Sequence, residues 1–587
     1  MQWRRWFLPG CCGLLLLPLL AAQERPRISR LPTVNDAMAL ISYDLRTLPP
    51  QDRIFQRFVW CPSGQTDDVK VLSFTLNTIS RGSVIIRPTP LGRGKLLVAR
   101  VDLRVYAPRA KDLNEWLRLW EEFQFDPALS LLITKGTLNL VQQSFPEWRG
   151  RGLVTRTEEG RRRTRVETVS VADLKDVELI RIPDPSLDVG LLAEVVGMTD
   201  SQSPLVSADY FIYRALSTIQ DAGVFKEIYG GLYYEFCGIP EKSKKGTDLD
   251  NLLEQLGVGN VAQGVTAKVV FEKLRSDQRA AIFRSNVTGN PRQMEFFPTL
   301  AVRPDKGQGL ATFTHDLKQQ SIDIDTHPVA NLLDFKADAS EGIFETTTGL
   351  HRYVLYDGAG KLQREVPPDV ANDSTIPPPH HQRLQPAISC ISCHEGDGQS
   401  DGWKRVTNDV NRLVGKGRAD IFGDLSRKND TISDTLDRLA GLYAGDPERA
   451  LQRGRDSYAS AVLRATGPWK ESEKGQTDAV TISAKRTVGN WRRFAYDLVD
   501  AQHALTEIGV EVADAADAVK VINELLMPDT RAAVNVPFVG VVVPEDPRTA
   551  ALKAGIGVTR WDWGFASAFA RERVRHNLAQ VMQRSKN

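Results

Sequence analysis

Histidine and cysteine are both scarce in this chain of 587 residues, which contains only eight histidines and six cysteines. The patterns G-x-S-x-G, H-E-x-x-H, G-x-G-x-x-G and the P-loop are missing. Their absence removes the common sequence signs of serine hydrolases, zinc peptidases, dinucleotide-dependent enzymes and nucleoside triphosphatases. The net charge is only +2, so no excess charge points to a nucleic acid or a membrane surface as partner.

The chain has one pronounced apolar run, at residues 11–22, and it follows the pair Arg4-Arg5. The run is too short to cross a bilayer comfortably, and small residues for cleavage follow at 21–23. We therefore expect residues 1–22 to be a removed signal peptide, which leaves no transmembrane segment and predicts a periplasmic or other extracytoplasmic location. A twin-arginine signal and a lipidated Cys11 are the less favoured alternatives, the second because Cys11 stands at the start of the apolar run and not at its end.

Two of the cysteines and one histidine stand together in Cys390-Ile391-Ser392-Cys393-His394. C-x-x-C-H is the pattern of covalent c-type haem attachment, in which both thiols bond to the haem and the adjacent imidazole binds the iron. A structural zinc site would need a second ligand pair, and no other close cysteine pair follows the signal peptide. A redox-active C-x-x-C would need a βαβ setting, which the prolines at 377–379 disfavour. We expect one haem c held by Cys390 and Cys393, with His394 as the proximal ligand.

Cys61 and Cys237 remain once the signal peptide and the motif are set aside. An even pair of cysteines in an oxidising compartment predicts a disulfide between them. Two buried thiols are the alternative.

Length and patterning predict an α+β multidomain protein. We expect mixed N-terminal and middle regions, a small cytochrome c-like haem region and a mostly helical C-terminal region. The boundaries are 23–195 for the N-terminal region, 196–337 for the middle region, 338–424 for the haem region and 425–587 for the helical region.

Hydrophobic periodicity predicts the individual elements. Strands are expected at 71–76, 83–86, 95–105, 343–344 and 353–356. Helices are expected at 113–123, 208–214, 248–256 and 512–526, and on a further face formed by Phe494, Leu498, Ala501 and Leu505. The arginine-rich stretch 149–165 is expected to be a solvated turn or loop.

Residues 344–360 and 387–394 resemble two segments of a large group of exported bacterial proteins that have a single C-x-x-C-H and long non-haem regions. Looser matches lie at 100–106, with Trp116 and Phe123, and at 209–211, with 234–240. The likeness therefore extends over most of the chain up to the haem motif, although only the motif is specific. It implies haem c binding and electron transfer, and it implies no substrate.

The second axial ligand of the iron would decide the chemistry, because a filled position suits electron transfer and an open one suits peroxide or small-ligand chemistry. His327 is the first candidate, since His327-Pro328 resembles a pair found in part of that group. His351 is the second candidate, at a position where the group often has glutamine. The other residues considered are His380, His381, Met294 and Met527.

These observations favour an exported c-type cytochrome that takes part in electron transfer with a redox partner protein. A haem-dependent peroxidase-like enzyme is one alternative, although a di-haem peroxidase would need two C-x-x-C-H motifs and there is one. A haem-bearing sensor or partner-binding protein is the other. The large amount of chain outside the motif favours partner docking over a freely diffusing carrier.

Overall fold

The computed structural model describes residues 34–61, 66–93, 96–126, 130–134, 152–157, 164–169, 179–183, 205–220, 230–241, 246–258, 280–282, 292–302, 308–318, 328, 335–366, 383–395, 446–473, 478–495, 498–507, 514–526, 554 and 557–558. The predicted signal peptide lies outside these residues. Within them the chain is mixed α and β, as the sequence predicted, and it forms three sheets. None of the helices in these ranges is both long enough and apolar enough to cross a bilayer.

The first sheet is buried on both faces. In strand β1, Phe58 and Trp60 pack with helix α1 (Val34–Arg46), whereas Val59 and Cys61 belong to the main core. Such two-sided burial explains the continuous apolar run of this strand. β8 runs parallel to β1, and the other neighbours are antiparallel. In spatial order the strands are β2 (Thr89–Arg93), β3 (Leu96–Asp102), β1 (Gln56–Cys61) and β8 (Leu205–Ser207).

Two buried helices cover the inner side of this sheet: α8 (Ala208–Leu216) packs on β1, and α3 (Thr66–Ile79) packs on α8. The strand predicted at 71–76 is therefore wrong. Every residue of α3 from Val71 to Ile79 is buried, so the helix has no polar face and its period does not show in the sequence. Asp67 and Asp68 lie in its first turn, where negative charge favours a helix.

Two other strand predictions fail because side chains bond to the backbone. At 83–86 there is no strand, since the Asn77 amide bonds both the N–H and the carbonyl of Ile86, at 3.1 and 2.8 Å. The strand predicted at 95–105 ends at Asp102, whose carboxylate accepts from the Arg104 N–H at 3.1 Å and starts helix α4 (Leu103–Tyr106).

The second sheet is an antiparallel meander of five strands, and it contains both strands predicted at 343–344 and 353–356. Its strands are β9 (Ala280–Ile282), β10 (Arg292–Val302), β11 (Gln308–Asp316), β12 (Ala339–Glu345) and β13 (His351–Asp357). Because side chains alternate along a strand, Glu341, Ile343 and Tyr353 share one face, and Phe344 and Arg352 share the other.

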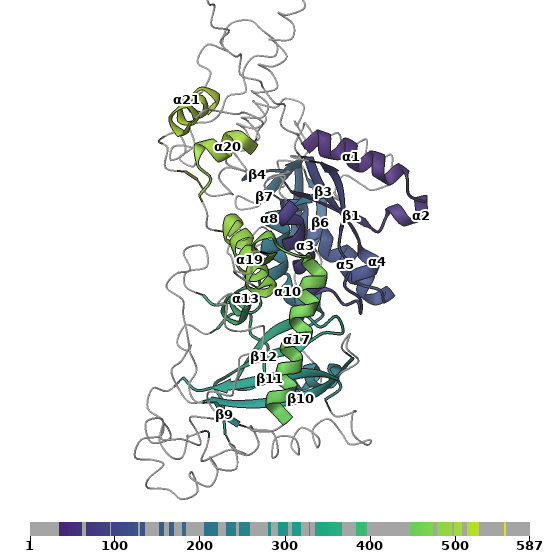
Figure 1. The fold of residues 1–587 in the computed structure, drawn as a ribbon. Helices are drawn as coiled ribbons and strands as arrows, with labels where there is room; N and C mark the ends of the chain where they lie inside the picture. Colours follow the sequence, from purple (N-terminus) through teal and green to yellow (C-terminus); the bar gives the residue numbers. More distant parts are fainter. Residues whose placement is uncertain are drawn as a thin grey trace, which may run out of the picture.

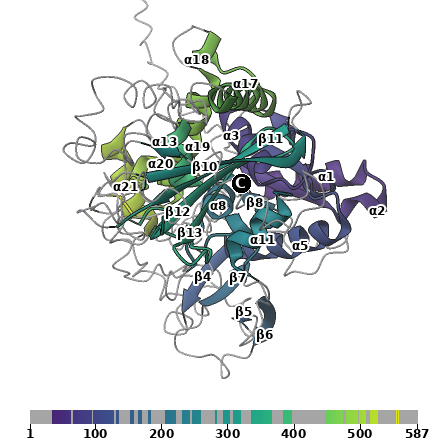
Figure 2. The same ribbon diagram turned by 90° about the horizontal axis from the view of Figure 1, so that it is seen from below.

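The third sheet overturns the prediction of a loop at 149–165. β5 and β6 pair antiparallel with Thr157 opposite Thr164, so part of the arginine-rich stretch is in strands. This sheet lies toward the side of the molecule away from helices α17 (Asp446–Thr466) and α18 (Lys470–Glu473) (Figure 2). In spatial order its strands are β4 (Ser130–Thr134), β7 (Leu179–Pro183), β5 (Gly152–Thr157) and β6 (Thr164–Val169).

Helix α17 (Asp446–Thr466) connects the first two sheets. It contacts β11 of the five-stranded sheet and also α3 and α19 (Ala479–Ala495), which lie beside the first sheet (Figure 1). The described C-terminal part is otherwise helical, as predicted, with α18 (Lys470–Glu473), α20 (Ala501–Glu507) and α21 (Ala515–Leu526). The face predicted for Phe494 and Leu505 is split between α19 and α20, because Val499 is extended and pairs with Val558.

The sheets do not follow the predicted region boundaries. β8 belongs to the predicted middle region, yet it pairs with β1 of the N-terminal region. The boundary at residue 338 falls between β11 and β12, which are neighbours in one sheet. The helices predicted at 113–123, 208–214 and 248–256 are confirmed as α5 (Ala110–Glu121) with its extension η1 (Glu122–Phe125), α8, and α11 (Asp248–Gln255). The remaining short helices are α2 (Pro50–Arg53), α10 (Tyr233–Cys237) and α13 (Ile388–Glu395).

An aromatic cluster fills the core between α5, α8 and α10. Phe211 is completely buried, and its ring lies 5.1 Å from both Trp120 and Phe123 and 6.3 Å from Phe236. Such rings combine a large buried apolar area with favourable tilted and edge-on contacts.

We expect Phe211→Ala to lower the free energy of unfolding by about 3–5 kcal/mol, because the lost ring leaves a cavity. Tyr43→Ala is the matched control: Tyr43 is 73% exposed, so its removal should change stability by no more than about 0.5 kcal/mol. Urea unfolding followed by tryptophan fluorescence measures both. Equal losses in the two variants would contradict this view of the core.

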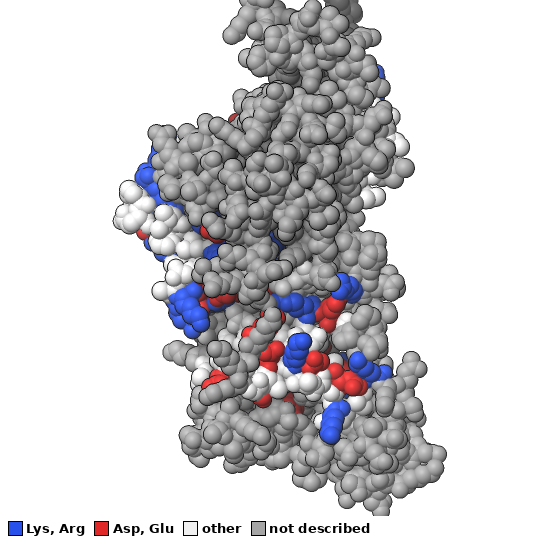
Figure 3. Space-filling model, turned by 180° about the vertical axis from the view of Figure 1, so that it is seen from behind, with Lys and Arg blue, Asp and Glu red and all other residues white. Residues whose placement is uncertain are grey.

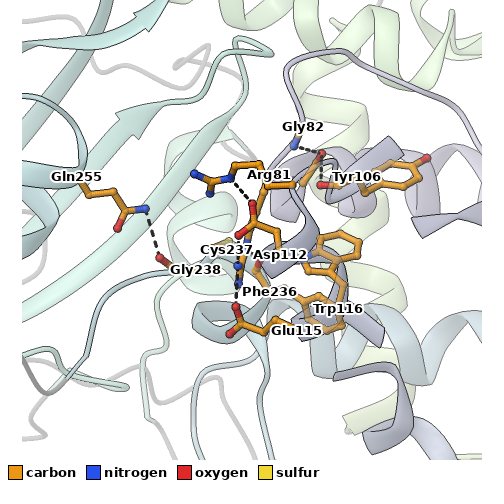
Figure 4. A network of polar contacts seen from close by, with 12 residues as sticks. Arg81, Gly82, Tyr106, Asp112, Glu115, Trp116, Phe236, Cys237, Gly238 and Gln255 are labelled. Carbon is orange, nitrogen blue, oxygen red and sulfur yellow. Dashed lines mark hydrogen bonds and ion pairs between the residues drawn. The ribbon is translucent and has the colours of Figure 1, made fainter. Parts of the chain in front are cut away.

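Arg81 holds α5 and α10 together at the end of α3 (Figure 4). Its Nη1 lies 2.8 Å from Asp112 and 2.7 Å from Glu115, and its Nε donates to the carbonyl of Phe236 at 2.8 Å. Asp112 also accepts from Arg109. Burial alone would raise the pKa of Asp112, but the bonds from Arg109 and Arg81 bring it below its ordinary value.

We expect Asp112→Asn to cost roughly 2 kcal/mol of stability at neutral pH, less than breaking a fully buried pair, because Glu115 stays beside Arg81. A lowered carboxyl pKa stabilises the fold above the unfolded-state pKa of about 3.9, and the contribution disappears as the pH falls through the folded-state pKa. The gap between wild type and variant should therefore close below about pH 4. Urea titrations at several pH values test this, and a gap independent of pH would refute it.

Candidate functional site

The C-x-x-C-H motif forms helix α13, which packs against α19 and lies beside β12 of the five-stranded sheet (Figure 1). Ile388 and Ile391 are buried, whereas Ser392 and Cys393 are exposed. Gln385, just before the helix, is buried and accepts a hydrogen bond from the Thr218 N–H at 3.1 Å. The helix is thus anchored on its apolar side, and one end of the motif is open to solvent.

Helical spacing brings the three motif side chains to one side of α13, because Cys393 and His394 follow Cys390 by three and four residues. One carboxylate oxygen of the sheet meets two of them. Oε1 of Glu341 accepts from the Cys390 thiol at 3.3 Å and lies 3.6 Å from Nε2 of His394. A thiol and an imidazole of the motif are therefore gathered at a single point on β12.

The electrostatics of this contact favour the anionic form of Glu341. Burial alone would raise its pKa, but the hydrogen bond and positive charge of His394, followed by Arg292, lower it to about 2. Burial, and then the charge of Glu341, raise the pKa of the Cys390 thiol well above its ordinary value. Cys390 is consequently a protonated thiol at neutral pH.

A buried hydrogen-bonded cluster lies next to the motif. Glu395, which directly follows His394, is completely buried and accepts from the hydroxyl of Tyr353 on β13. Burial raises the pKa of Glu395 to about 7, although its hydrogen bonds to Tyr353 and to Tyr458 of α17 oppose the rise. The ring of Tyr353 also lies 6.2 Å from that of His394.

His351 lies within electrostatic range of His394, on the same sheet face as Tyr353 and Glu341. It is 1% exposed, and its ring stacks on Tyr458 with centroids 4.0 Å apart. Burial, and then the charge of His394, lower the pKa of His351 well below its ordinary value, so its imidazole is neutral at neutral pH.

Of the other candidates for the second axial ligand, Met294 lies on the same face of the sheet, since it pairs with Thr314, which pairs with Glu341. It is buried, two strands away from Glu341. His327, His380, His381 and Met527 lie outside the described residues.

The donor set fits covalent haem. Cys390 and Cys393 are separate thiols, and the atom of His394 that meets Glu341 is Nε2, a nitrogen that binds haem iron. Binding at Nε2 requires the Glu341 carboxylate to leave that atom. Within the described ranges, no three histidine, cysteine or acidic side chains are grouped to hold a metal ion by themselves.

Cys61 and Cys237 are two buried thiols in this structure and are not joined in a disulfide. Asp68 and Asp209 are the charges near Cys61, whereas Arg352 and Arg81 are those near Cys237, so the two thiols have different surroundings. Burial raises the pKa of both.

The sequence reasoning missed Glu341, Glu395, Tyr353 and Tyr458 as neighbours of the motif. Glu395 could have been identified from the sequence as a neighbour of the motif, because it follows His394 directly. Glu341 carries no local signal, since it precedes Cys390 by 49 residues and reaches the motif only through the sheet. The chain matches no protein-family model, no curated protein and no solved structure.

We expect Cys393 to react with iodoacetamide at least about tenfold faster than Cys390 when the chain is made without haem, because Cys393 is exposed and the pKa of Cys390 is raised. Glu341→Gln should speed the reaction of Cys390. Peptide mass spectrometry over time measures both rates, and the same experiment in urea should abolish the difference. A native Cys390 as reactive as Cys393 would contradict the arrangement.

Proposed function

We propose that this protein is an exported c-type cytochrome that binds one covalent haem and transfers electrons to or from a partner protein. The observation that carries the proposal is the convergence of Cys390 and His394 of one helix on a single oxygen of Glu341, with Cys393 exposed on the same helix. Two thiols and an imidazole in one turn are the donor set of haem c.

Each residue has a role in this proposal. Cys390 and Cys393 hold the haem through thioether bonds, and His394 is the proximal ligand. When bound, haem c supplies a one-electron couple whose potential depends on the axial ligands and on burial. Ile388 and Ile391 anchor α13 in the core, and Tyr353 limits the movement of the adjacent Glu395. The attachment helix is thereby fixed in the fold.

His351 is our candidate for the second axial ligand. Iron binds a neutral imidazole, and burial keeps His351 neutral on the face of the sheet that α13 covers. Met294 is also on that face, but it belongs to β10, which is separated by β11 from the strand β12 that carries Glu341. The resemblance of His327-Pro328 to other proteins carries less weight than this placement of His351.

The exposed end of α13 suits exchange with a partner, because Ser392 and Cys393 reach the surface. The described residues on the face in Figure 3 carry basic and acidic side chains interspersed, without a broad region of one sign. The charge balance of +2 points the same way. A partner would therefore dock by shape and local pairing more than by long-range attraction.

The first test uses the full chain, produced with export and haem-maturation machinery. A pyridine-haemochrome assay on the denatured protein should give one covalent haem per chain. Cys393→Ala should lose two-bond attachment, and His394→Ala should shift the Soret band. Cys61→Ala is the matched control and should keep the wild-type spectrum. The haem assignment fails if Cys393→Ala and His394→Ala also keep the wild-type spectrum.

The second test asks which residue completes the coordination. We expect six-coordinate, low-spin iron in the wild type and a change of spin state in His351→Ala, measured by absorption and electron paramagnetic resonance. His315→Ala is the control, because His315 is also a buried histidine of this sheet but pairs with Glu295 and Ser340. An unchanged spin state in His351→Ala would exclude this ligand, and five-coordinate iron in the wild type would favour peroxide or small-ligand chemistry.

A further inference from the structure

A cleft of about 580 Å³ lies between helices α3, α5, α10 and α11 and the five-stranded sheet, and its volume is within the size range of small-molecule sites. Its walls come from the end of α3, the start of α5, the ends of α10 and α11, and strands β10, β12 and β13. The cleft is separate from the haem motif, because none of its lining residues belongs to α13.

Four cationic and three acidic side chains line the cleft. Arg81 pairs with Asp112 and Glu115, and Arg109 pairs with Asp112, so two positive and two negative charges neutralise one another. Lys111, Arg352 and Glu345 remain. By strand alternation the Glu345 side chain leaves the sheet on the face opposite to Arg352, and its carboxylate accepts from the Leu310 N–H at 2.9 Å, so Lys111 and Arg352 leave positive charge in excess. Lys111 is exposed and makes no ion pair or hydrogen bond with any other described residue.

Arg352 is the most informative of these groups. It is 8% exposed, and its Nη1 and Nη2 donate to the backbone carbonyls of Cys237 and Ser80, not to carboxylates. Its Nε–H finds no acceptor among the described residues. A buried donor without an acceptor costs roughly 1–3 kcal/mol, so a buried guanidinium with a vacant N–H favours an anion that supplies the acceptor.

We propose that this cleft binds the oxyanion group of a small acid, a carboxylate or a phosphate, with Arg352 and Lys111 as its cationic partners. Arg352 supplies directed N–H donors in a low-dielectric wall, and Lys111 supplies a point charge at the mouth. Thr346 and Thr347 line the same cleft beside Phe344. The site therefore accepts an anion attached to a small organic body.

By strand alternation, the side chains of Phe344 and Arg352 leave the sheet on the face opposite to Glu341 and Tyr353, which meet the haem motif. The anion site is thus independent of whether haem is attached. Failure of one proposal leaves the other standing.

The test is equilibrium dialysis of the full-length protein with radiolabelled inorganic phosphate and, in a separate arm, with radiolabelled succinate. We expect saturable binding of at least one anion at one site per chain. Arg352→Lys keeps the charge but loses the Nε–H, so it should weaken binding about tenfold or more. Lys111→Gln should weaken it about threefold.

Lys485→Gln is the matched control, because Lys485 is an exposed lysine on α19 and is not in the cleft lining. The affinity of Lys485→Gln for phosphate and for succinate should equal that of the wild type. Arg352 also bonds two carbonyls, so circular dichroism must show that Arg352→Lys folds; if it does not, the Lys111→Gln result decides. Binding of phosphate alone or of succinate alone identifies which oxyanion the cleft takes.

The proposal is overturned if neither anion binds saturably in the low millimolar range. It is overturned equally if Lys485→Gln weakens binding as much as Lys111→Gln does, because binding would then follow net charge and not this cleft.

Discussion

Side chains next to each other on a β-strand point to opposite faces of the sheet, and in β12 and β13 this alternation places both candidate sites. The register of the two strands sends Glu341 and Tyr353 toward helix α13, and Phe344 and Arg352 toward the cleft. A shift of one residue would exchange the two sets, so the C-x-x-C-H motif would face a guanidinium and the cleft would face a carboxylate. The pairing of a single hairpin therefore underlies the chemistry on both sides of the sheet.

What holds that hairpin in place comes from distant parts of the chain. Gly349, in the turn between the two strands, has φ +87°, and a Cβ there would lie 3.2 Å from Ser457 and 3.3 Å from Ala461 of α17. The backbone of the turn therefore approaches the helix closely, as only glycine allows. The same helix supplies Tyr458, which stacks on His351 and bonds Glu395. Helix α17 thus fixes the turn, the candidate axial ligand and the buried acid together.

The local features of the fold followed from the sequence, and the long-range ones did not. The strands predicted at 343–344 and 353–356 are confirmed as parts of β12 and β13, which are joined by a short local connection. α3 was mistaken for a strand because it is buried on all sides, and the strand expected at Ile86 is replaced by bonds to Asn77. The three motif residues were evident from their types and spacing, whereas Glu341 and Tyr458 reach them only through tertiary packing. Sequence patterns report a residue's neighbours along the chain, and a functional site depends on its neighbours in space.

The shortness of α13 has a consequence for the order of events in maturation. A helix of eight residues is not stable alone in water, so in the unfolded chain the motif has no helical structure until it packs against the sheet and α19. In the folded protein, Glu341 already lies against Cys390 and His394. Haem attachment as proposed is therefore easiest before β12 pairs with its neighbours, when both thiols are still accessible. Haem attachment would then come before the strands of the five-stranded sheet pair, and this order would be part of the assembly of the protein.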